Sequence, residues 1–415
     1  MREMKDSGVA WIGAMPQTWG MNTVAQIFLQ VKCKNTGLRE KNLLSLSYGK
    51  VKRKRIDTVE GLLPESFDGY NIIEKDDIVL RLTDLQNDHT SLRVGIAEER
   101  GIITSAYLTI RNRSNFCPKY LYYYLHSFDI AKGFYGMGAG VRQGLNWDGV
   151  KWLKILAPSV PEQERIAAFL DAECAEIDTV LEKTRASIEE YKKLKQAVIT
   201  QAVTKGIRGD RPMKNSGIEW IGEIPAEWGV VPHKRIMHKV KEICEQYNGE
   251  DIISLTVNGV VKRDLTAGGK MPTSFDGYQY VEPNDLLLCL FDIDVTPRCV
   301  GVVRDYGVTS PAYSRFVMHD GYYNAYYDYL LRMIDDNKVF VHLSKNLRSS
   351  LTESDFGAIK TCAPPLAEQK CIAAFLDVRC DEIDALIAKK QQYLTEIETY
   401  KKSLIYEYVT GKKEV

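Results

Sequence analysis

The chain has 415 residues, of which 45% are hydrophobic and 27% charged, an ordinary composition for a globular protein of about two to four domains. Its 55 Lys and Arg residues balance 55 Asp and Glu residues, so the formal net charge is zero. A run of about 18 uncharged apolar residues, a signal-type segment and a Cys-x-x-Cys pair are all absent from the sequence. These features argue against a transmembrane helix and a disulfide framework, and they predict a cytoplasmic protein with no metal and no cofactor.

Four segments of the first half return in the second half. The repeated segments are residues 5–16 and 214–225, the pairs Trp19-Gly20 and Trp228-Gly229, the pairs Glu162-Gln163 and Glu368-Gln369, and residues 166–171 and 372–377. The repeat distance is 209 residues at the first of these and 206 at the last. A period this long indicates a duplicated domain rather than a solenoid repeat, so we expect two similar halves in one pseudo-twofold molecule.

Each half is predicted to open with a mixed α/β domain. Short apolar runs bounded by Gly, Asn or Asp are typical of strands. They lie at residues 43–48, 78–82, 252–257 and 286–290. The pentapeptide Ser-Phe-Asp-Gly-Tyr occurs at 66–70 and again at 274–278, where it indicates a turn, and a short helix is expected near 120–128.

Basic residues are concentrated in one part of the first domain. Residues 30–60 carry nine Lys or Arg against three acids, and the run at 50–55 directly follows the first predicted strand. A basic run is often only a solvated face, but residues 259–263 carry a counterpart at the same point of the second half. Lys and Arg neutralise phosphates, Arg also pairs with guanine, and Asn and Gln pair with adenine. The candidate nucleic-acid-binding residues are Tyr48, Lys50, Lys52, Arg53, Lys54, Arg55, Arg81, Arg142, Gln143, Asn258, Lys262, Arg263, Arg298, Lys345, Asn346 and Arg348.

A long helix is predicted to close each half. Residues 164–203 contain no Pro and no Gly, and apolar residues recur there at steps of three, four and seven, which is typical of a coiled-coil seam. About forty residues make a helix of roughly 60 Å, so we expect the two helices to pair antiparallel and to hold the globular domains apart. The alternative is that each helix lies on its own domain. The predicted seam consists of Leu170, Ile177, Leu181, Ile188, Tyr191, Leu376, Ile383, Leu386, Ile397 and Leu404.

The helices are also acidic, with nine acids against three basic residues between 161 and 190. Such a surface would be repelled by a polyanion and is expected to face solvent or another protein. The candidate partner-binding residues are Glu173, Glu176, Glu182, Glu189, Glu382 and Glu396.

Two segments superficially resemble catalytic motifs. The glycine-rich stretch 136–140 does not follow a predicted strand, and its counterpart at 343–347 has no glycine, so a loop is favoured over a cofactor site. Ser310-Pro311-Ala312-Tyr313 lacks the second proline of the tetrapeptide with which amino-methyltransferases grip a flipped base, so the end of a strand is favoured there. No phosphate-binding Gly-x-x-x-x-Gly-Lys loop occurs, and we expect no catalytic site.

Over its whole length the chain resembles the specificity subunits of type I restriction–modification systems. The resemblance is carried by Ser-Gly-x-x-Trp-Ile-Gly-x-x-Pro at the start of each half and by Glu-Gln-x-x-Ile-Ala-x-Phe-Leu-Asp at the start of each long helix. It extends to residues 142–145 and 348–351 upstream of the helices, and departs only at Leu366-Ala367, where the first half has Val160-Pro161.

The resemblance implies an α+β fold with two target recognition domains, at residues 1–160 and 209–365. Two long antiparallel coiled-coil helices, at 161–208 and 366–415, would separate them. It also implies a non-catalytic subunit that reads a split, asymmetric site on double-stranded DNA. Two methyltransferase subunits would dock on the helices, and restriction subunits would join that core.

Two other classes of protein compete with this interpretation. A self-sufficient nuclease or methyltransferase would need a cofactor loop and a catalytic tetrapeptide, and neither is convincing in this sequence. A purely structural coiled-coil dimer would leave the basic segment and the two large mixed domains without a role.

Overall fold

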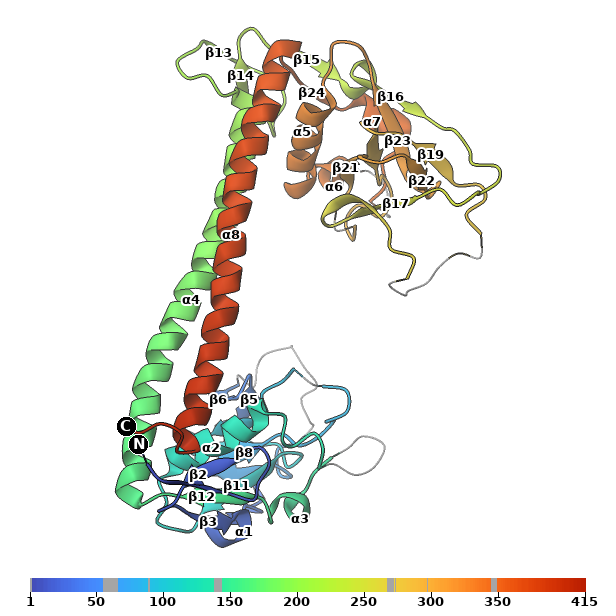
Figure 1. Ribbon diagram of the computed structural model, residues 1–415. Coiled ribbons are helices and arrows are strands. Elements are labelled where there is room, and N and C mark those ends of the chain that lie inside the picture. The colour runs from blue at the N-terminus through green and yellow to red at the C-terminus, as the bar shows by residue number, and fades with distance from the viewer. Residues whose placement is uncertain are drawn as a thin grey trace. The chain divides into compact units, whose positions relative to one another are not determined.

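The computed structural model describes residues 2–54, 66–88, 90–137, 144–266, 272, 274–296, 298–344 and 349–415. The chain divides into two compact units (Figure 1). Unit 1 consists of Met1–Arg185 and Gln392–Val415, and unit 2 of Ala186–Gln391. Each unit therefore contains one globular part together with a segment of each long helix.

The globular part of unit 1 is built around a four-stranded antiparallel sheet in the order β4-β11-β8-β9. Three further pairs, β1 with β2, β3 with β12 and β7 with β10, and the hairpin β5–β6 surround it. The elements are β1 Met4–Asp6, β2 Ala14–Pro16, β3 Gly20–Thr23, α1 Val24–Ile27, β4 Phe28–Gln30, β5 Leu44–Ser47, β6 Lys50–Arg53, β7 Asn71–Ile73, β8 Ile78–Leu80, β9 Val94–Ile96, β10 Gly101–Ile103, β11 Leu108–Asn112, α2 Pro118–Ile130, α3 Trp147–Val150, β12 Lys154–Ala157 and α4 Val160–Lys205.

The globular part of unit 2 repeats this plan, with a central sheet in the order β16-β23-β20-β21. Its hairpin β17–β18 is joined through β22 to β19, and β17 runs parallel to β22. The elements are β13 Met213–Asn215, β14 Glu223–Pro225, β15 Gly229–Pro232, the 3-10 helix η1 His233–Arg235, β16 Met237–Val240, β17 Ile252–Thr256, β18 Gly259–Lys262, β19 Gln279–Val281, β20 Leu286–Leu288, β21 Val300–Val302, β22 Gly307–Thr309, β23 Ser314–Met318, α5 Asn324–Asp336, α6 Val339–Leu343, α7 Glu353–Ala358, β24 Lys360–Ala363 and α8 Leu366–Val409.

Segments of both long helices complete the core of each unit. In unit 1 the core includes Leu170 from the start of α4, together with Leu404 and Val409 from the end of α8. In unit 2 it includes Leu376 from the start of α8, together with Val203 from the end of α4. Each of these side chains is at most 3% exposed, so their transfer out of water favours the docked helices. The last helix of the chain therefore stabilises the first globular part.

The helices run antiparallel where they meet. In unit 1, Asp178 pairs with Lys401 at 2.6 Å and Arg185 with Glu398 at 2.6 Å. In unit 2, Lys195 pairs with Asp384 at 2.6 Å. Residue numbers fall along α8 as they rise along α4, as expected for an antiparallel pair. The predicted fold class, two mixed domains with two long packed helices, is confirmed.

The predicted seam is wrong at Leu386, which is 42% exposed. Leu170, Ile177, Leu181, Ile188, Leu376, Ile383 and Leu404 are buried, and Tyr191 and Ile397 are half-buried. Along α8 the covered positions are 376, 380, 383, 387, 390, 394 and 397, so the steps alternate between four and three. The sequence interpretation placed the second heptad position one residue too early. A pair of helices buries only a narrow stripe, so a shift of one residue moves a side chain out to solvent.

Two local expectations are refined by the structure. The first long helix was expected over residues 161–208 and is observed as α4 over Val160–Lys205, so Pro161 lies in its first turn, where its missing N–H has no partner to lose. The helix expected near 120–128 extends over Pro118–Ile130. The segment 310–313 forms the turn between β22 and β23.

Candidate nucleic-acid interface

A tight hairpin carries the basic run of unit 1. Strands β5 and β6 pair antiparallel, with Ser47 opposite Lys50. The two turn residues, Tyr48 and Gly49, have φ values of 48° and 74°, as in a type I′ turn, whose twist matches that of paired strands. The Tyr48 side chain is 88% exposed. The turn therefore presents an aromatic ring to solvent next to a basic strand.

The three basic side chains of β6 have different surroundings. Lys50 lies 3.7 Å from the Asp178 carboxylate of α4. Arg53 forms an ion pair with Glu99, and this contact holds the pKa of the Glu99 carboxyl below its usual value. Lys52 is exposed and has no ion-pair partner among the described residues. Lys52 is thus the cation of this strand that is most available to a phosphate.

A buried arginine shapes the loop after β8. Arg93 has no exposed surface, and its guanidinium donates to the carbonyl oxygens of Thr83 at 2.8 Å and Arg81 at 3.0 Å and to the Tyr135 hydroxyl at 3.0 Å. Its backbone N–H donates to Asp129, whose pKa is raised by burial to about 6. Sequence reasoning missed Arg93, because its only signal is a lone Arg within an apolar run.

Three segments of unit 1 meet beside the hairpin tip. A Cβ placed on Gly49 would lie 3.1 Å from the Leu92 side chain, and the Leu145 N–H donates to the Leu82 carbonyl at 2.9 Å. Thr83, Asp84, Asn87 and Gly144 line a hollow of about 660 Å³. We call residues 48–49, 81–88, 90–92 and 144–145 the loop edge of unit 1.

Unit 2 has an equivalent loop edge, formed by residues 257–258, 289–296, 298 and 349–351. Gly259 closes the β17–β18 turn with a φ of 98°, and Val257 is 57% exposed. The Arg298 side chain donates to the Val257 carbonyl at 2.9 Å. The N–H of Ile293 donates to the Ser349 carbonyl at 3.0 Å. The two edges therefore share a plan but present different side chains.

The remaining candidate residues are not all gathered on these edges. Asn258 is exposed at its hairpin tip, whereas Arg263, just after β18, and Lys54, just after β6, are half-buried. Lys262 pairs with Asp251 at 2.5 Å, and Arg81 lies 3.7 Å from Asp88. The candidates Arg55, Arg142, Gln143, Lys345, Asn346 and Arg348 lie outside the described residues.

The repeated sequence motifs tie each globular part to its long helix. Trp19 Nε1 donates to Glu162 at 3.1 Å in unit 1, and Trp228 Nε1 donates to Glu368 at 2.8 Å in unit 2. The ion pairs completing these clusters are Arg2–Glu162 at 2.5 Å and Arg211–Glu368 at 2.6 Å. The side-chain oxygen of the glutamine after each glutamate accepts a hydrogen bond from the backbone N–H of a helix N-cap residue. Gln163 accepts from Cys117 before α2 at 2.9 Å, and Gln369 accepts from Tyr323 before α5 at 2.7 Å. These motifs position the globular parts on the helices.

The acidic helix residues lie largely in solvent. Glu173 is half-buried, and Glu176, Glu182, Glu189, Glu382 and Glu396 are exposed. Three of them contact neighbours on their own helix, in the pairs Glu189–Lys192 at 2.8 Å, Glu382–Arg379 at 2.7 Å and Glu396–Gln392 at 2.8 Å. Contacts of this kind stabilise a helix only slightly, so they leave the side chains open to a partner.

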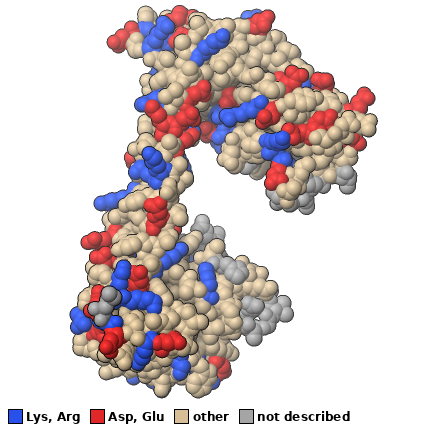
Figure 2. All heavy atoms as spheres, in the orientation of Figure 1, with Lys and Arg blue, Asp and Glu red and all other residues tan. Residues whose placement is uncertain are grey.

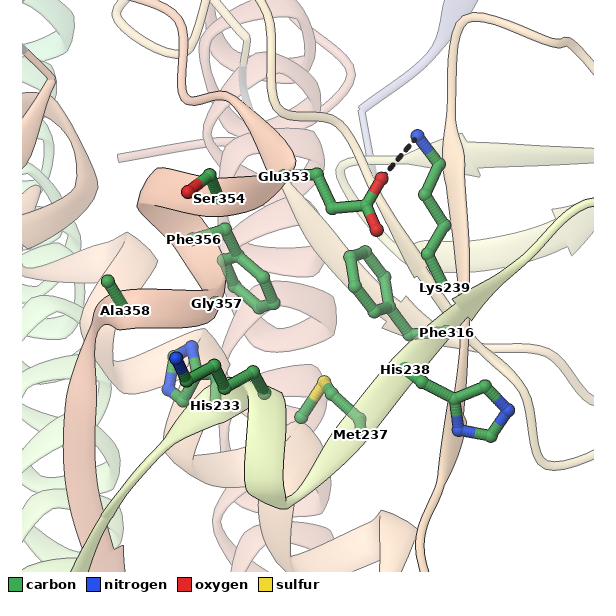
Figure 3. A pocket seen from close by; sticks show the side chains of 11 residues that line it. His233, Met237, His238, Lys239, Phe316, Glu353, Ser354, Phe356, Gly357 and Ala358 are labelled. Carbon is green, nitrogen blue, oxygen red and sulfur yellow. Dashed lines mark ion pairs between the residues drawn. The ribbon is translucent and has the colours of Figure 1, made fainter.

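Unit 2 also has a hollow of about 550 Å³ between η1, β16, β23 and α7 (Figure 3). Phe316, Phe356 and Met237 form its apolar part, and Glu353 reaches Lys239 at 3.5 Å. His233 is fully buried there, and burial lowers its pKa to about 3, so it is neutral at physiological pH. A buried neutral imidazole among aromatic rings is typical of a core, and nothing in the hollow matches a catalytic arrangement.

Positive and negative side chains are interspersed on the visible face, with no single broad basic patch (Figure 2). Among the described residues, no group of three or more His, Cys, Asp or Glu side chains is placed to hold a metal ion. In the described part of the chain no helix is long and apolar enough to cross a membrane.

No family model matches the chain. It is 24% identical over 428 residues to a putative type I restriction enzyme MjaX specificity subunit of Methanocaldococcus jannaschii, covering 97% of this chain and 96% of that protein. A solved structure from a study of complex assembly and conformational transition of the type I restriction–modification system matches with a TM-score of 0.71 and 15% identity, covering 96% of this chain and 99% of the other. The HsdS subunit from Thermoanaerobacter tengcongensis matches with a TM-score of 0.52 and 14% identity, covering 96% and 98%.

The two solved structures confirm the fold, and the relative extends the likeness along nearly the whole sequence. The chain is similar over nearly its whole length to the specificity subunits of type I restriction–modification systems, as the repeated motifs predicted. Subunits of this family recognise the DNA target within a restriction–modification complex and are themselves non-catalytic.

Proposed function

We propose that the chain reads a split, asymmetric site on double-stranded DNA, with the loop edge of each unit reading one part. Residues 1–160 and 209–365 act as the two target recognition domains, and residues 161–208 and 366–415 act as the spacer helices. The subunit works in the cytoplasm, where two methyltransferase subunits dock on the helices and restriction subunits join that core.

The observation that carries this proposal is the pair of loop edges, which have the same plan and unlike side chains. The tip of unit 1 presents Tyr48 and the basic strand β6, whereas the tip of unit 2 presents Val257 and Asn258. Lysines of a strand contact phosphates regardless of sequence, and amide and guanidinium groups discriminate bases. Two edges of unlike chemistry therefore suit two half-sites of unlike sequence.

The surface of the long helices supports docking of protein partners. The large apolar side chains exposed on α4 and α8 are Val180, Leu194, Leu366, Phe375, Val378, Leu386, Tyr393 and Tyr400. Apolar groups that stay exposed beside charged ones are typical of interaction surfaces. The exposed glutamates would give such an interface charge specificity rather than most of its affinity.

An exchange of one globular part tests the proposal. Residues 24–153 lie between β3 and β12, which pair with each other from Thr23–Lys154 to Gly20–Ala157. Replacing 24–153 with the same region of a relative keeps this strand pair and the Glu162 cluster intact. The complete complex should then methylate a site with one new half-site, while the other half-site and the gap stay the same.

The matched exchange in unit 2 replaces residues 233–359, between β15 and β24, which pair in the same way. It should change only the other half-site. Methylation-site mapping of the two chimaeras decides the matter, because a simultaneous change of both half-sites in either chimaera contradicts independent reading by the two units.

A further inference from the structure

A tyrosine–aspartate contact recurs at the same place in both units. In unit 1 the Tyr123 hydroxyl of α2 donates to Asp171 of α4 at 2.8 Å. In unit 2 the Tyr329 hydroxyl of α5 donates to Asp377 of α8 at 2.8 Å. The two contacts span the same 48 residues of sequence and use the Asp of the repeated Phe-Leu-Asp motif. Burial raises the pKa of both tyrosines, so the hydroxyls keep the proton that they donate.

The contact lies well away from the first attachment of each globular part. That attachment is the Trp–Glu–Arg cluster in the first turn of the long helix, at Glu162 or Glu368. Asp171 and Asp377 each follow nine residues later, which is about 13 Å along the helix axis. Two attachments this far apart fix the angle between the globular part and the long helix, whereas the first attachment alone would let the globular part pivot about it. A displacement of about 1 Å at the second attachment turns the globular part by roughly 4° over that length.

Each tyrosine–aspartate contact also marks the edge of a hollow between the globular part and the long helices. In unit 1 the hollow measures about 530 Å³ and is lined by Tyr123 and Asp171. In unit 2 it measures about 920 Å³ and is lined by Tyr329 and Asp377. Side chains around a hollow have room to move, so a globular part can tilt toward or away from the helices there unless a directed contact prevents it.

The two units differ in how firmly the aspartate is held. Asp171 also forms an ion pair with Lys119, one turn before Tyr123 on α2. The position equivalent to Lys119 in unit 2 is Ala325, which has no charge to offer. Among the described residues, unit 2 therefore combines the larger hollow with a single hydrogen bond to the aspartate.

We propose that Tyr123–Asp171 and Tyr329–Asp377 are positioning contacts that fix the angle of each recognition domain on the spacer helices and thereby restrict the gap allowed between the two half-sites. This inference rests on the proposed function, in which each unit reads one half-site. These residues contact no base in the proposal. They act by orienting a whole loop edge.

The test uses the complete complex with its methyltransferase subunits and a DNA library in which the gap varies in steps of one base pair. Tyr329→Phe removes one hydroxyl and leaves the ring in place. Loss of a hydrogen bond to a charged acceptor changes an equilibrium by about tenfold. The preference for the native gap over its neighbours should therefore fall by about tenfold, with the same bases read in both half-sites. Tyr123→Phe should have a smaller effect, because Lys119 still holds Asp171.

Tyr124→Phe is the matched control. The Tyr124 hydroxyl donates to the Lys154 carbonyl at 3.0 Å, so this hydrogen bond lies inside the globular part of unit 1 and does not join it to a long helix. Its removal should leave the gap preference unchanged. If Tyr329→Phe lowers the melting temperature more than this control does, Asp377→Asn supplies a second variant, which keeps an oxygen to accept the bond and should give an intermediate gap preference.

The outcomes separate the two levels of the proposal. If the unaltered complex methylates no split site, the proposed function fails. If the unaltered complex methylates a split site but Tyr329→Phe and Asp377→Asn keep its gap preference, the positioning role is wrong while the proposed function stands. If the Tyr124 control broadens the gap as much as Tyr329→Phe does, general loosening explains the effect and the assignment is also wrong.

Discussion

Lys52, on strand β6 next to the loop edge of unit 1, offers the sharpest test of phosphate contact. It is exposed on β6, and no carboxylate among the described residues forms an ion pair with it and so competes with a phosphate. Each phosphate contact adds about 0.9 to the slope of log affinity against log salt. Lys52→Gln should reduce the slope by about that amount. Between roughly 50 and 500 mM salt, the ratio of unaltered to variant affinity should then fall by about eightfold.

Arg53 and Glu99 provide a graded comparison with Lys52. Arg53 is already paired with Glu99, so Arg53→Gln should reduce the slope by less than Lys52→Gln does. Glu99→Gln releases the guanidinium and removes a negative charge from the same surface. An exposed pair of this kind is weak, so the release should strengthen DNA binding by only a few-fold.

Fluorescence anisotropy with labelled target DNA, repeated over a salt series, measures both quantities for the assembled complex. Lys75→Gln is the matched control, because Lys75 is exposed in the same unit but lines the hollow beside the long helices. An unchanged slope for Lys52→Gln would refute the reasoning, as would an equal loss for the Lys75 control.

Three further predictions concern stability and spacing. Glu368→Ala should lower the free energy of unfolding by about 3 kcal/mol, and Glu162→Ala should lower it by less. The reason is burial: the side chains of Arg211 and Glu368 are 11% and 9% exposed, whereas those of Arg2 and Glu162 are 25% and 14% exposed. Equal losses measured by calorimetry would contradict this. Burial raises the pKa of the Asp129 carboxyl in the folded protein to about 6, so the fold favours its protonated form. The resulting stabilisation is fully present below about pH 4 and is lost as the pH rises through 6. Asp129→Asn should thus gain melting temperature relative to the unaltered chain at pH 8 but not at pH 4, and a pH-independent difference would count against it. Inserting four residues in each long helix, within 186–190 and 391–396, lengthens each helix by about 6 Å. The tolerated gap between the half-sites should then grow by about one or two base pairs. If methylation-site mapping shows an unchanged gap, the helices do not set its length.

Much of the fold could be predicted because its signals are local. The strands expected at 43–48, 78–82, 252–257 and 286–290 appear as β5, β8, β17 and β20, each slightly shorter than expected. Apolar runs ended by turn residues carry this information within a few residues. The sequence predicted less reliably which residues form the helix seam. Neighbouring positions can both be apolar, and only packing against the partner helix decides which of the two is covered. Leu386 was assigned to the seam for that reason, whereas the half-buried residue is Ile387.

The candidate interface could be predicted only in outline. Equivalent placement in a duplicated sequence identified the two basic segments, and the structure shows that each one follows a hairpin turn. Whether a basic side chain is available to a phosphate depends on its neighbours in space. Glu99 pairs with Arg53 and Asp251 pairs with Lys262, and neither acid is adjacent in sequence to its partner. The Arg93 side chain, which shapes the loop edge of unit 1, has no repeated counterpart that could have identified it.

The sequence by itself determined that this protein is a duplication with two long helices, and it identified the family through motifs repeated about 200 residues apart. These properties depend on residue identity and short-range periodicity, which are present in the chain before it folds. Only the tertiary structure decided that the end of α8 completes the core of unit 1, that Trp19 meets Glu162 across 143 residues, and that a tyrosine and an aspartate join each globular part to its helix. Such contacts depend on burial and on hydrogen-bond geometry between distant segments, and the local pattern of either segment does not specify its partner.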